Sequence, residues 1–266
     1  MIVLGAVLPH PPILLPQIAQ GREVHAHSTL NAYETVGVRL QELDIQRVLL
    51  ISTHGIVTLN RFHTLGADLS GNFERFGHPG LTFEHAIDQE MAQLLADAAE
   101  SAELPLSRTP IWEQSDHSVG VPITLLADAL PPRVGVVSIS FRSPADHYRL
   151  GQTIGKALAA FDEPTAIIAS GDAVHRLNED SPRGSHPRGE EVQQTYETAL
   201  TNWDHEALMA IDESLRRDVD ESVVSPTLIL MGAMQELGAN PRILCSEHPW
   251  GVGYVTALVD TTPEHH

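Results

Sequence analysis

The chain has 266 residues, of which 42% are hydrophobic and 19% are charged, a composition typical of a globular protein with a sizeable core. The formal net charge of −19 argues against nucleic acid and anionic membrane as partners, because both need a surface rich in Lys and Arg. It does not exclude a small anionic ligand, since a metal or a local arginine can reverse the field inside a pocket.

The strand and helix patterns alternate along the chain. The first half predicts strands over residues 2–8, 47–52 and 62–69 and helices over about 28–43 and 88–101. Ser70-Gly71-Asn72 is typical of a turn. The second half predicts strands over 134–141, 165–169, 242–245 and 254–259. It also predicts a helix that begins after Ser143 and three further helices over about 189–202, 205–211 and 222–237. This order predicts an α/β fold, a single domain with a central mixed, mostly parallel sheet flanked by helices.

No repeat or long linker divides the chain, so residues 1–262 are expected to form one domain. Residues 263–266, which include His265 and His266, are set apart as a tail or the remnant of a purification tag. Cys245 is the single cysteine, so an internal disulfide is excluded. The apolar run at the N-terminus is too short to cross a bilayer and lacks a charged leader. We therefore expect a cytoplasmic protein.

Two histidines directly follow the strongest apolar runs. His10 lies in Pro9-His10-Pro11-Pro12 after the first strand, and His54 lies in Ser52-Thr53-His54-Gly55 after the second. Ligands of open α/β sheets gather beyond the carboxyl ends of such strands. The prolines around His10 fix its backbone, and a metal ligand needs a pre-set direction. The pattern predicts that both imidazoles bind one metal.

Three further residues are candidates for the same site. His175 follows the strand that ends near Ser170, and it could act as a general acid or base because imidazole changes charge near neutral pH. His117 could equally be a turn residue or a residue that donates a hydrogen bond to one of the metal ligands. Glu221 could complete a set of two histidines and one carboxylate, although the helix dipole alone favours a carboxylate at the start of a helix.

Several short motifs occur in an order and spacing that identify a family, although each is weak by itself. They are Leu8-Pro9-His10-Pro11-Pro12, Ser52-Thr53-His54-Gly55, Gly71-Asn72-Phe73-Glu74-Arg75-Phe76-Gly77, Asp116-His117-Ser118 with Pro122, Ser170-Gly171-Asp172-Ala173-Val174-His175-Arg176-Leu177, Glu221 ahead of Leu228-Ile229-Leu230-Met231-Gly232-Ala233, and Pro249-Trp250-Gly251-Val252-Gly253-Tyr254. With them, nearly the whole chain resembles the class III extradiol dioxygenases of the LigB type. That superfamily includes the catalytic subunit of protocatechuate 4,5-dioxygenase and the Memo-like proteins.

The resemblance implies a catalytic domain over residues 1–262 in which His10, His54 and Glu221 hold a non-haem Fe(II), with zinc or manganese as alternatives. It implies that His175 is the catalytic acid or base and that His117, also catalytic, faces the substrate or oxygen. The expected reaction opens the ring of a small aromatic substrate, a catechol or an aminophenol, with O2. Relatives are often homo-oligomers or pair with a small accessory subunit, and either is compatible with this sequence.

The chain departs from the family pattern at Thr53, where proline is expected, at Gly55, where alanine is commoner, and at Val174, where serine is usual. The residue that completes the metal site also differs among relatives. The rivals to Glu221 here are Cys245, Glu247 and His248. Two other functions stay open at this point, a Memo-like metal-binding protein and a zinc-type hydrolase on the same fold.

Overall fold

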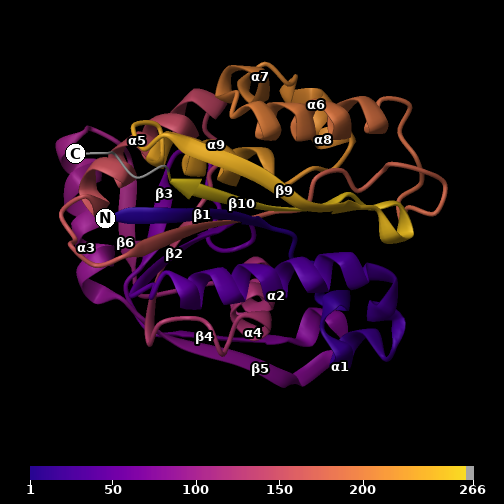
Figure 1. Ribbon diagram of the computed structural model, residues 1–266, viewed down its shortest axis with the longest axis horizontal. Coiled ribbons are helices and arrows are strands. Elements are labelled where there is room, and N and C mark those ends of the chain that lie inside the picture. The colour runs from indigo at the N-terminus through magenta and orange to yellow at the C-terminus, as the bar shows by residue number, and fades with distance from the viewer. Residues whose placement is uncertain (262–266) are drawn as a thin grey trace.

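A computed structural model of the protein describes residues 1–261, and the predicted tail at 263–266 lies outside this range. Within it the chain forms a ten-stranded sheet between two layers of helices (Figure 1). The predicted fold class, an α/β domain with a central mixed, mostly parallel sheet, is confirmed. In the part of the chain described, no helix is both long and apolar enough to cross a membrane.

The strands follow the order β4-β5-β7-β2-β8-β1-β10-β9 across the sheet, while β3 pairs with β7 and β6. Their bounds are β1 Ile2–Leu8, β2 Arg47–Ser52, β3 Phe62–Leu65, β4 Leu69–Phe73, β5 His78–Ile87, β6 Leu106–Thr109, β7 Arg133–Ser138, β8 Thr165–Ser170, β9 Ala239–Glu247 and β10 Tyr254–Thr261. The centre, from β7 through β2 and β8 to β1, is parallel, and β10 and β9 extend it antiparallel. The carboxyl ends of β1, β8 and β2 therefore lie side by side.

The central strands are buried on both faces, which explains their nearly continuous apolar sequences. In β2, Leu49 and Ile51 pack into the core on one face of the sheet, whereas Val48 and Leu50 pack into the core on the other. Consecutive side chains of a strand point to opposite faces, so alternate residues of the strand contribute to different cores.

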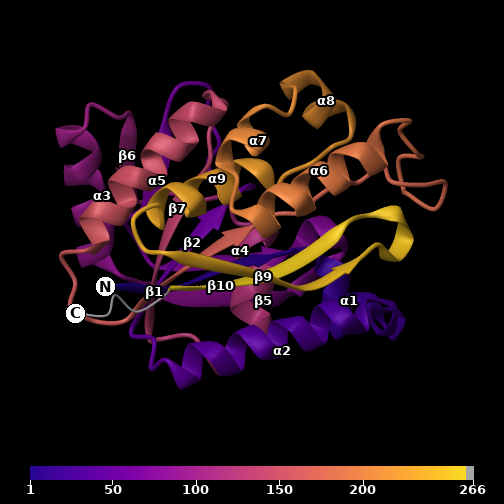
Figure 2. The same ribbon diagram turned by 45° about the horizontal axis from the view of Figure 1, so that its top comes forward.

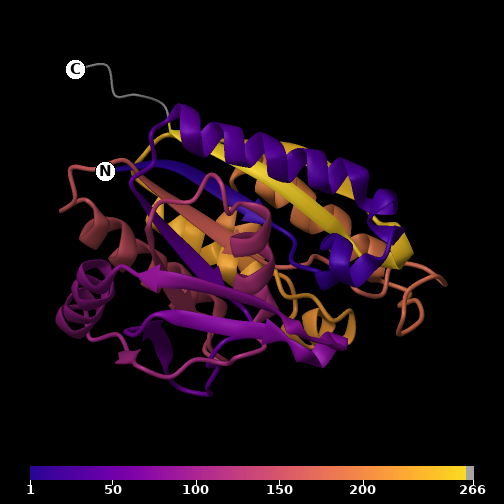
Figure 3. The same ribbon diagram turned by 90° about the horizontal axis from the view of Figure 1, so that it is seen from below.

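Helices cover both faces (Figures 1 and 2). Their bounds are α1 Pro16–Ala19, α2 His27–Glu42, α3 Gln89–Ser101, α4 His117–Leu125, α5 Pro144–Leu158, α6 Gly189–Asn202, α7 His205–Met209, α8 Glu213–Asp218 and α9 Val224–Ala233. One layer contains α3, α5, α6 and α9 and the other contains α2 and α4. Seen from below, α2 runs along β9 and β10 (Figure 3).

Helices α5 and α9 pack with their backbones in close contact, and glycine makes this approach possible. A Cβ atom placed on Gly151 would lie 2.1 Å from the carbonyl oxygen of Ile229, closer than any side chain could come. A side chain there would force the helices apart. This contact fixes α9 against α5, and the segment around Glu221 directly precedes α9.

Most predicted elements are present, with four differences. The strand predicted over residues 62–69 is divided into β3 and β4. The turn predicted at Ser70-Gly71-Asn72 is wrong, because these residues lie within β4 and pair with β5. The helix predicted over 222–237 is shorter, since α9 covers Val224–Ala233. The elements α1, β5, β6, α4 and α8 were not predicted, and α4 is the one that matters for the site.

Candidate metal centre

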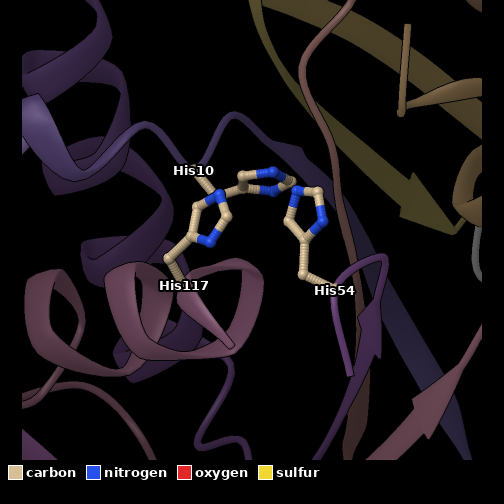
Figure 4. A group of neighbouring side chains, drawn as sticks. All are labelled: His10, His54 and His117. Carbon is tan, nitrogen blue, oxygen red and sulfur yellow. The ribbon is translucent and has the colours of Figure 1, made fainter. Parts of the chain in front are cut away.

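Three histidines from separate elements meet at the carboxyl edge of the sheet. His10 follows β1, His54 follows β2, and His117 is the first residue of α4. Each offers a ring nitrogen, and these three atoms all lie within 4.8 Å of one another. Figure 4 shows the imidazoles directed toward one another. Among residues 1–261, this is the one group of three or more His, Cys, Asp or Glu side chains with potential ligand atoms this close.

The three rings are arranged so that their edges face a shared space. His54 and His117 stack with their centroids 4.2 Å apart and 16° between the ring planes. His10 stands nearly perpendicular to both, at 5.0 Å from His54 and 5.1 Å from His117. Imidazole nitrogen suits Fe, Zn, Cu and Ni, so the donor set fits a divalent transition metal.

Burial keeps these imidazoles in the neutral state that a metal needs. It is the main cause that lowers the pKa of His10, of His54 and of His117, and for His117 the pKa falls to about 3. Lone pairs on ring nitrogens are therefore free at neutral pH. His10 is further oriented by Ser170, whose hydroxyl lies 2.9 Å from Nδ1. A partner on one ring nitrogen is a common way to fix the direction of a histidine ligand.

His175 lies beside this cluster in the loop after β8 and is held by a buried aspartate. Its Nε2 is 3.4 Å from the carboxylate of Asp172, and its Nδ1 contacts the backbone oxygen of Asp220. Burial alone would lower the pKa of His175, but Asp172 and Asp220 outweigh burial and raise it. His175 thus differs from the three clustered histidines, because its surroundings favour the charged imidazolium.

The side chain of Glu221 is buried close to this region, but its carboxylate has other partners. One oxygen pairs with the guanidinium of Arg216, and the other accepts the backbone N–H of Val224 at 2.9 Å at the start of α9. Glu221 is not a member of the three-histidine group. Its role as the third metal ligand stays a prediction.

The rival third ligands lie on or just after the edge strand β9 and are likewise outside the group. The thiol of Cys245 lies 3.9 Å from the hydroxyl of Thr29, and Glu247 accepts two hydrogen bonds from that threonine. His248 comes directly after the strand, at the start of the turn to β10.

A pocket of about 720 Å³ opens over the cluster. His54, His117, His175 and Glu221 line it, together with Thr53 and Gly55. Its walls also carry apolar side chains, among them Val57, Ile139 and Phe141. Pockets of this volume with a mixed lining are typical of small-molecule sites.

Five arginines line the same pocket, Arg75, Arg142, Arg183, Arg216 and Arg217, against four acidic residues, Glu113, Glu213, Asp220 and Glu221. The whole chain has 16 Lys and Arg against 35 Asp and Glu. Arginine is thus slightly more frequent than acidic residues in this lining, unlike in the chain as a whole, and each of these arginines pairs with a carboxylate.

Two buried aspartates of this site had no role in the sequence analysis. Asp172 lies in a motif noted for its histidine, and Asp116 precedes His117. A sequence signal existed for both, since each stands one to three residues before a candidate histidine. Nothing in the pattern showed that either side chain points inward.

Comparisons with known proteins identify the family of the chain. A sequence model of the catalytic LigB subunit of aromatic ring-opening dioxygenase matches residues 4–257. Protein CA_C1420 of Clostridium acetobutylicum is 26% identical over 259 residues, covering 93% of this chain and 55% of that protein. The chain thus spans about half the length of this curated relative.

Two other matches point the same way. A 3,4-dihydroxyphenylacetate 2,3-dioxygenase of Escherichia coli is 24% identical over 190 residues, covering 67% of this chain and 68% of that enzyme. The crystal structure of the uncharacterized protein JW3007 from Escherichia coli K12 superimposes with a TM-score of 0.67 at 18% identity, over 96% of this chain and 99% of that one. The structural match supports the fold alone.

Proposed function

The chain belongs to the family of catalytic LigB subunits of aromatic ring-opening dioxygenases, and from this premise we propose that it is an Fe(II)-dependent extradiol-type dioxygenase that opens the ring of a small catechol or aminophenol with O2. The observation that carries the proposal is the meeting of His10, His54 and His117 beneath a pocket that also presents His175. This reaction needs neutral imidazoles that can bind the metal and a separate imidazole, stabilised in its protonated form, that can accept a proton.

The metal is proposed to bind His10 and His54, with His117 as the third ligand because its nitrogen already lies within reach of the other two. Glu221, the third ligand implied by the family resemblance, has its carboxylate occupied by Arg216 and Val224. When bound, Fe(II) supplies the chemistry that joins a diol and dioxygen, by holding both and passing electron density between them.

His175 is proposed as the base that accepts a proton from a substrate hydroxyl. The carboxylate of Asp172 stabilises the imidazolium that forms, in the same way that it raises the resting pKa. The backbone oxygen of Asp220 at Nδ1 fixes the ring and leaves Nε2 as the atom that exchanges the proton.

The side chains of the pocket walls support this choice of substrate class. Val57, Ile139 and Phe141 provide apolar surface for a ring. Arg75, Arg183 and Arg217 are exposed and each pairs with a carboxylate of this protein. Such surface pairs contribute little free energy, so these guanidinium groups can turn to an anion on the substrate. We therefore expect an aromatic diol or aminophenol that carries a negatively charged substituent.

The test is anaerobic loading of the metal-free protein with Fe(II), addition of a catechol panel, and admission of air. The panel pairs each neutral catechol with its carboxylated analogue, 3,4-dihydroxyphenylacetate included. Stoichiometric oxygen uptake with a new absorption from the ring-opened product supports the proposal, and the carboxylated member should react faster. Iron bound at one equivalent without oxygen uptake across the panel would contradict it. The His54→Ala variant gives the baseline.

A second function, metal-assisted hydrolysis, is favoured by one observation. Three imidazoles without a carboxylate in the ligand group form a donor set that zinc enzymes use to activate water. Zinc-loaded protein that hydrolyses activated esters, while the iron-loaded form consumes no oxygen, would favour this alternative.

A further inference from the structure

Asp116 is a fully buried aspartate whose carboxylate accepts four hydrogen bonds. One oxygen accepts from the backbone N–H of Ser118 at 3.0 Å and from its hydroxyl at 2.6 Å. The other accepts from the hydroxyl of Ser52 at 2.6 Å and from the indole N–H of Trp112 at 2.7 Å. Two carboxylate oxygens offer about four acceptor positions, so Asp116 uses all of them.

The cap of α4 explains only part of this arrangement. Asp116 is the N-cap residue of that helix, and a cap needs one bond to a backbone N–H in the first turn. The bonds from Ser52 at the end of β2 and from Trp112 cross to other parts of the site. A carboxylate that served the helix alone would have no use for them.

The hydroxyls of Ser52 and Ser118 link Asp116 by hydrogen bonds to the loop that carries His54. Because each serine hydroxyl donates its hydrogen to Asp116, the oxygen of that hydroxyl can accept a hydrogen bond from another group. Ser118 accepts the backbone N–H of Thr53 at 3.0 Å and that of His54 at 3.2 Å, and Ser52 accepts that of Gly55 at 2.9 Å. Three successive backbone N–H groups around His54 are therefore held by hydroxyls that Asp116 holds.

Trp112 closes the loop from the other side. A Cβ atom on Gly55 would lie 2.3 Å from the indole ring, so the ring packs directly against the backbone next to His54. The hydrogen bond to Asp116 fixes the indole in that place. The His54 loop is thus held by hydrogen bonds on one side and by an aromatic ring on the other, and both depend on the same carboxylate.

We propose that Asp116 is a positioning residue for the metal centre, which sets the distance between the imidazoles of His54 and His117. Asp116 is the chain neighbour of His117 and is linked through Ser118 to the backbone of His54. Its buried carboxylate also places a negative charge behind two ligands of a cation. The inference rests on the metal centre proposed above, but it does not depend on which reaction that centre performs.

The experiment is a titration of metal-free protein with Co(II), whose visible absorption reports ligand number and geometry. In Asp116→Asn the side chain keeps its size, but the amide nitrogen cannot accept a hydrogen bond. We expect the Kd for Co(II) to rise roughly 10- to 100-fold and the spectrum to change in shape. Ser118→Ala keeps the carboxylate but removes the hydroxyl that joins it to the backbone N–H groups of Thr53 and His54, so a smaller change of the same kind is expected.

Asp88→Asn is the matched control. Asp88 is also a buried aspartate that caps a helix, α3, where it accepts from the N–H of Met91 and pairs with Arg47. This variant should lose stability but keep the Co(II) affinity and spectrum of the parent protein. That contrast separates a general effect of cap removal from an effect on the metal site.

The outcomes divide clearly. If Asp116→Asn and Ser118→Ala both keep the parental Kd and spectrum, Asp116 only caps α4 and the proposal is wrong. If Asp116→Asn does not fold, Ser118→Ala decides. A parent protein that binds Co(II) but shows no oxygenase activity would refute the proposed reaction and leave this inference standing. A parent that binds no Co(II) would refute both.

Discussion

The carboxylate of Asp172 lies 3.4 Å from Nε2 of His175 and accepts, through its other oxygen, the backbone N–H of His10 at 3.0 Å. One buried side chain therefore contacts both the proposed base and the segment that carries a proposed metal ligand. Asp172 thus connects the proposed base to the segment of the proposed metal ligand.

His175→Gln should keep the metal and lose turnover. Glutamine can fill the space but cannot carry a proton at neutral pH, so kcat is expected to fall about 10²- to 10⁴-fold. Metal content per chain and steady-state oxygen uptake measure the two properties separately. A variant that loses its iron would show that His175 is a ligand instead.

The third metal ligand can be identified by comparing His117→Ala with Glu221→Gln. We expect His117→Ala to weaken Fe(II) or Zn(II) binding by two orders of magnitude or more. Glu221→Gln should keep one metal per chain but lose roughly 3 kcal/mol of stability, because the guanidinium of Arg216 is then left largely buried without its partner. Metal content and denaturant unfolding measure these. The reverse pattern, with the metal lost only in Glu221→Gln, would make Glu221 the ligand that the family resemblance implies.

Gly55→Ala should damage the loop that carries His54. The added Cβ would lie 2.3 Å from the ring of Trp112, and relief of such a clash typically costs about 1 to 3 kcal/mol. We expect a lower melting temperature and weaker metal binding together. Gly80→Ala is the control, since a Cβ there meets no atom within 4 Å. Equal effects from both substitutions would mean that the contact with Trp112 does not matter.

His147 should make stability depend on pH below neutrality. Burial lowers its pKa from 6.5 to about 4, while its ring contacts the backbone oxygen of Ser143 and the N–H of Ser140. The unfolded chain then binds the proton more readily than the folded one. Stability from this group is complete above pH 6.5 and is lost as pH falls toward 4, by about 3 kcal/mol in total.

The measurement is denaturant unfolding of metal-free protein at several pH values, for the parent and for His147→Gln. The parent also contains the clustered histidines with lowered pKa, so only the difference between the two proteins reports His147. That difference should be constant above pH 6.5 and shift steadily below it. A difference that does not change with pH would refute this role.

The sequence allowed His10 and His54 to be predicted as neighbours because each follows a strand buried on both faces, and such strands belong to the centre of a parallel sheet. His117 could not be placed in the same way. The helix that it begins contains Gly120 and Pro122 and is apolar on every side, so no helical period was visible. Strand β5 was missed for a different reason, since it begins with His78-Pro79-Gly80 and only Phe83 and Ile87 of its residues are buried.

The proposed ligands come from the loops after β1 and β2 and from the start of α4, which lie far apart along the chain and meet only when the sheet is assembled. An unfolded polypeptide therefore offers no comparable site, and the proposed metal would bind the folded state in preference. Free metal at a hundred times its Kd would then add about 3 kcal/mol to the folded state. If the proposed centre binds its metal, metal supply would help to set the fraction of molecules that are folded, separately from any catalysis.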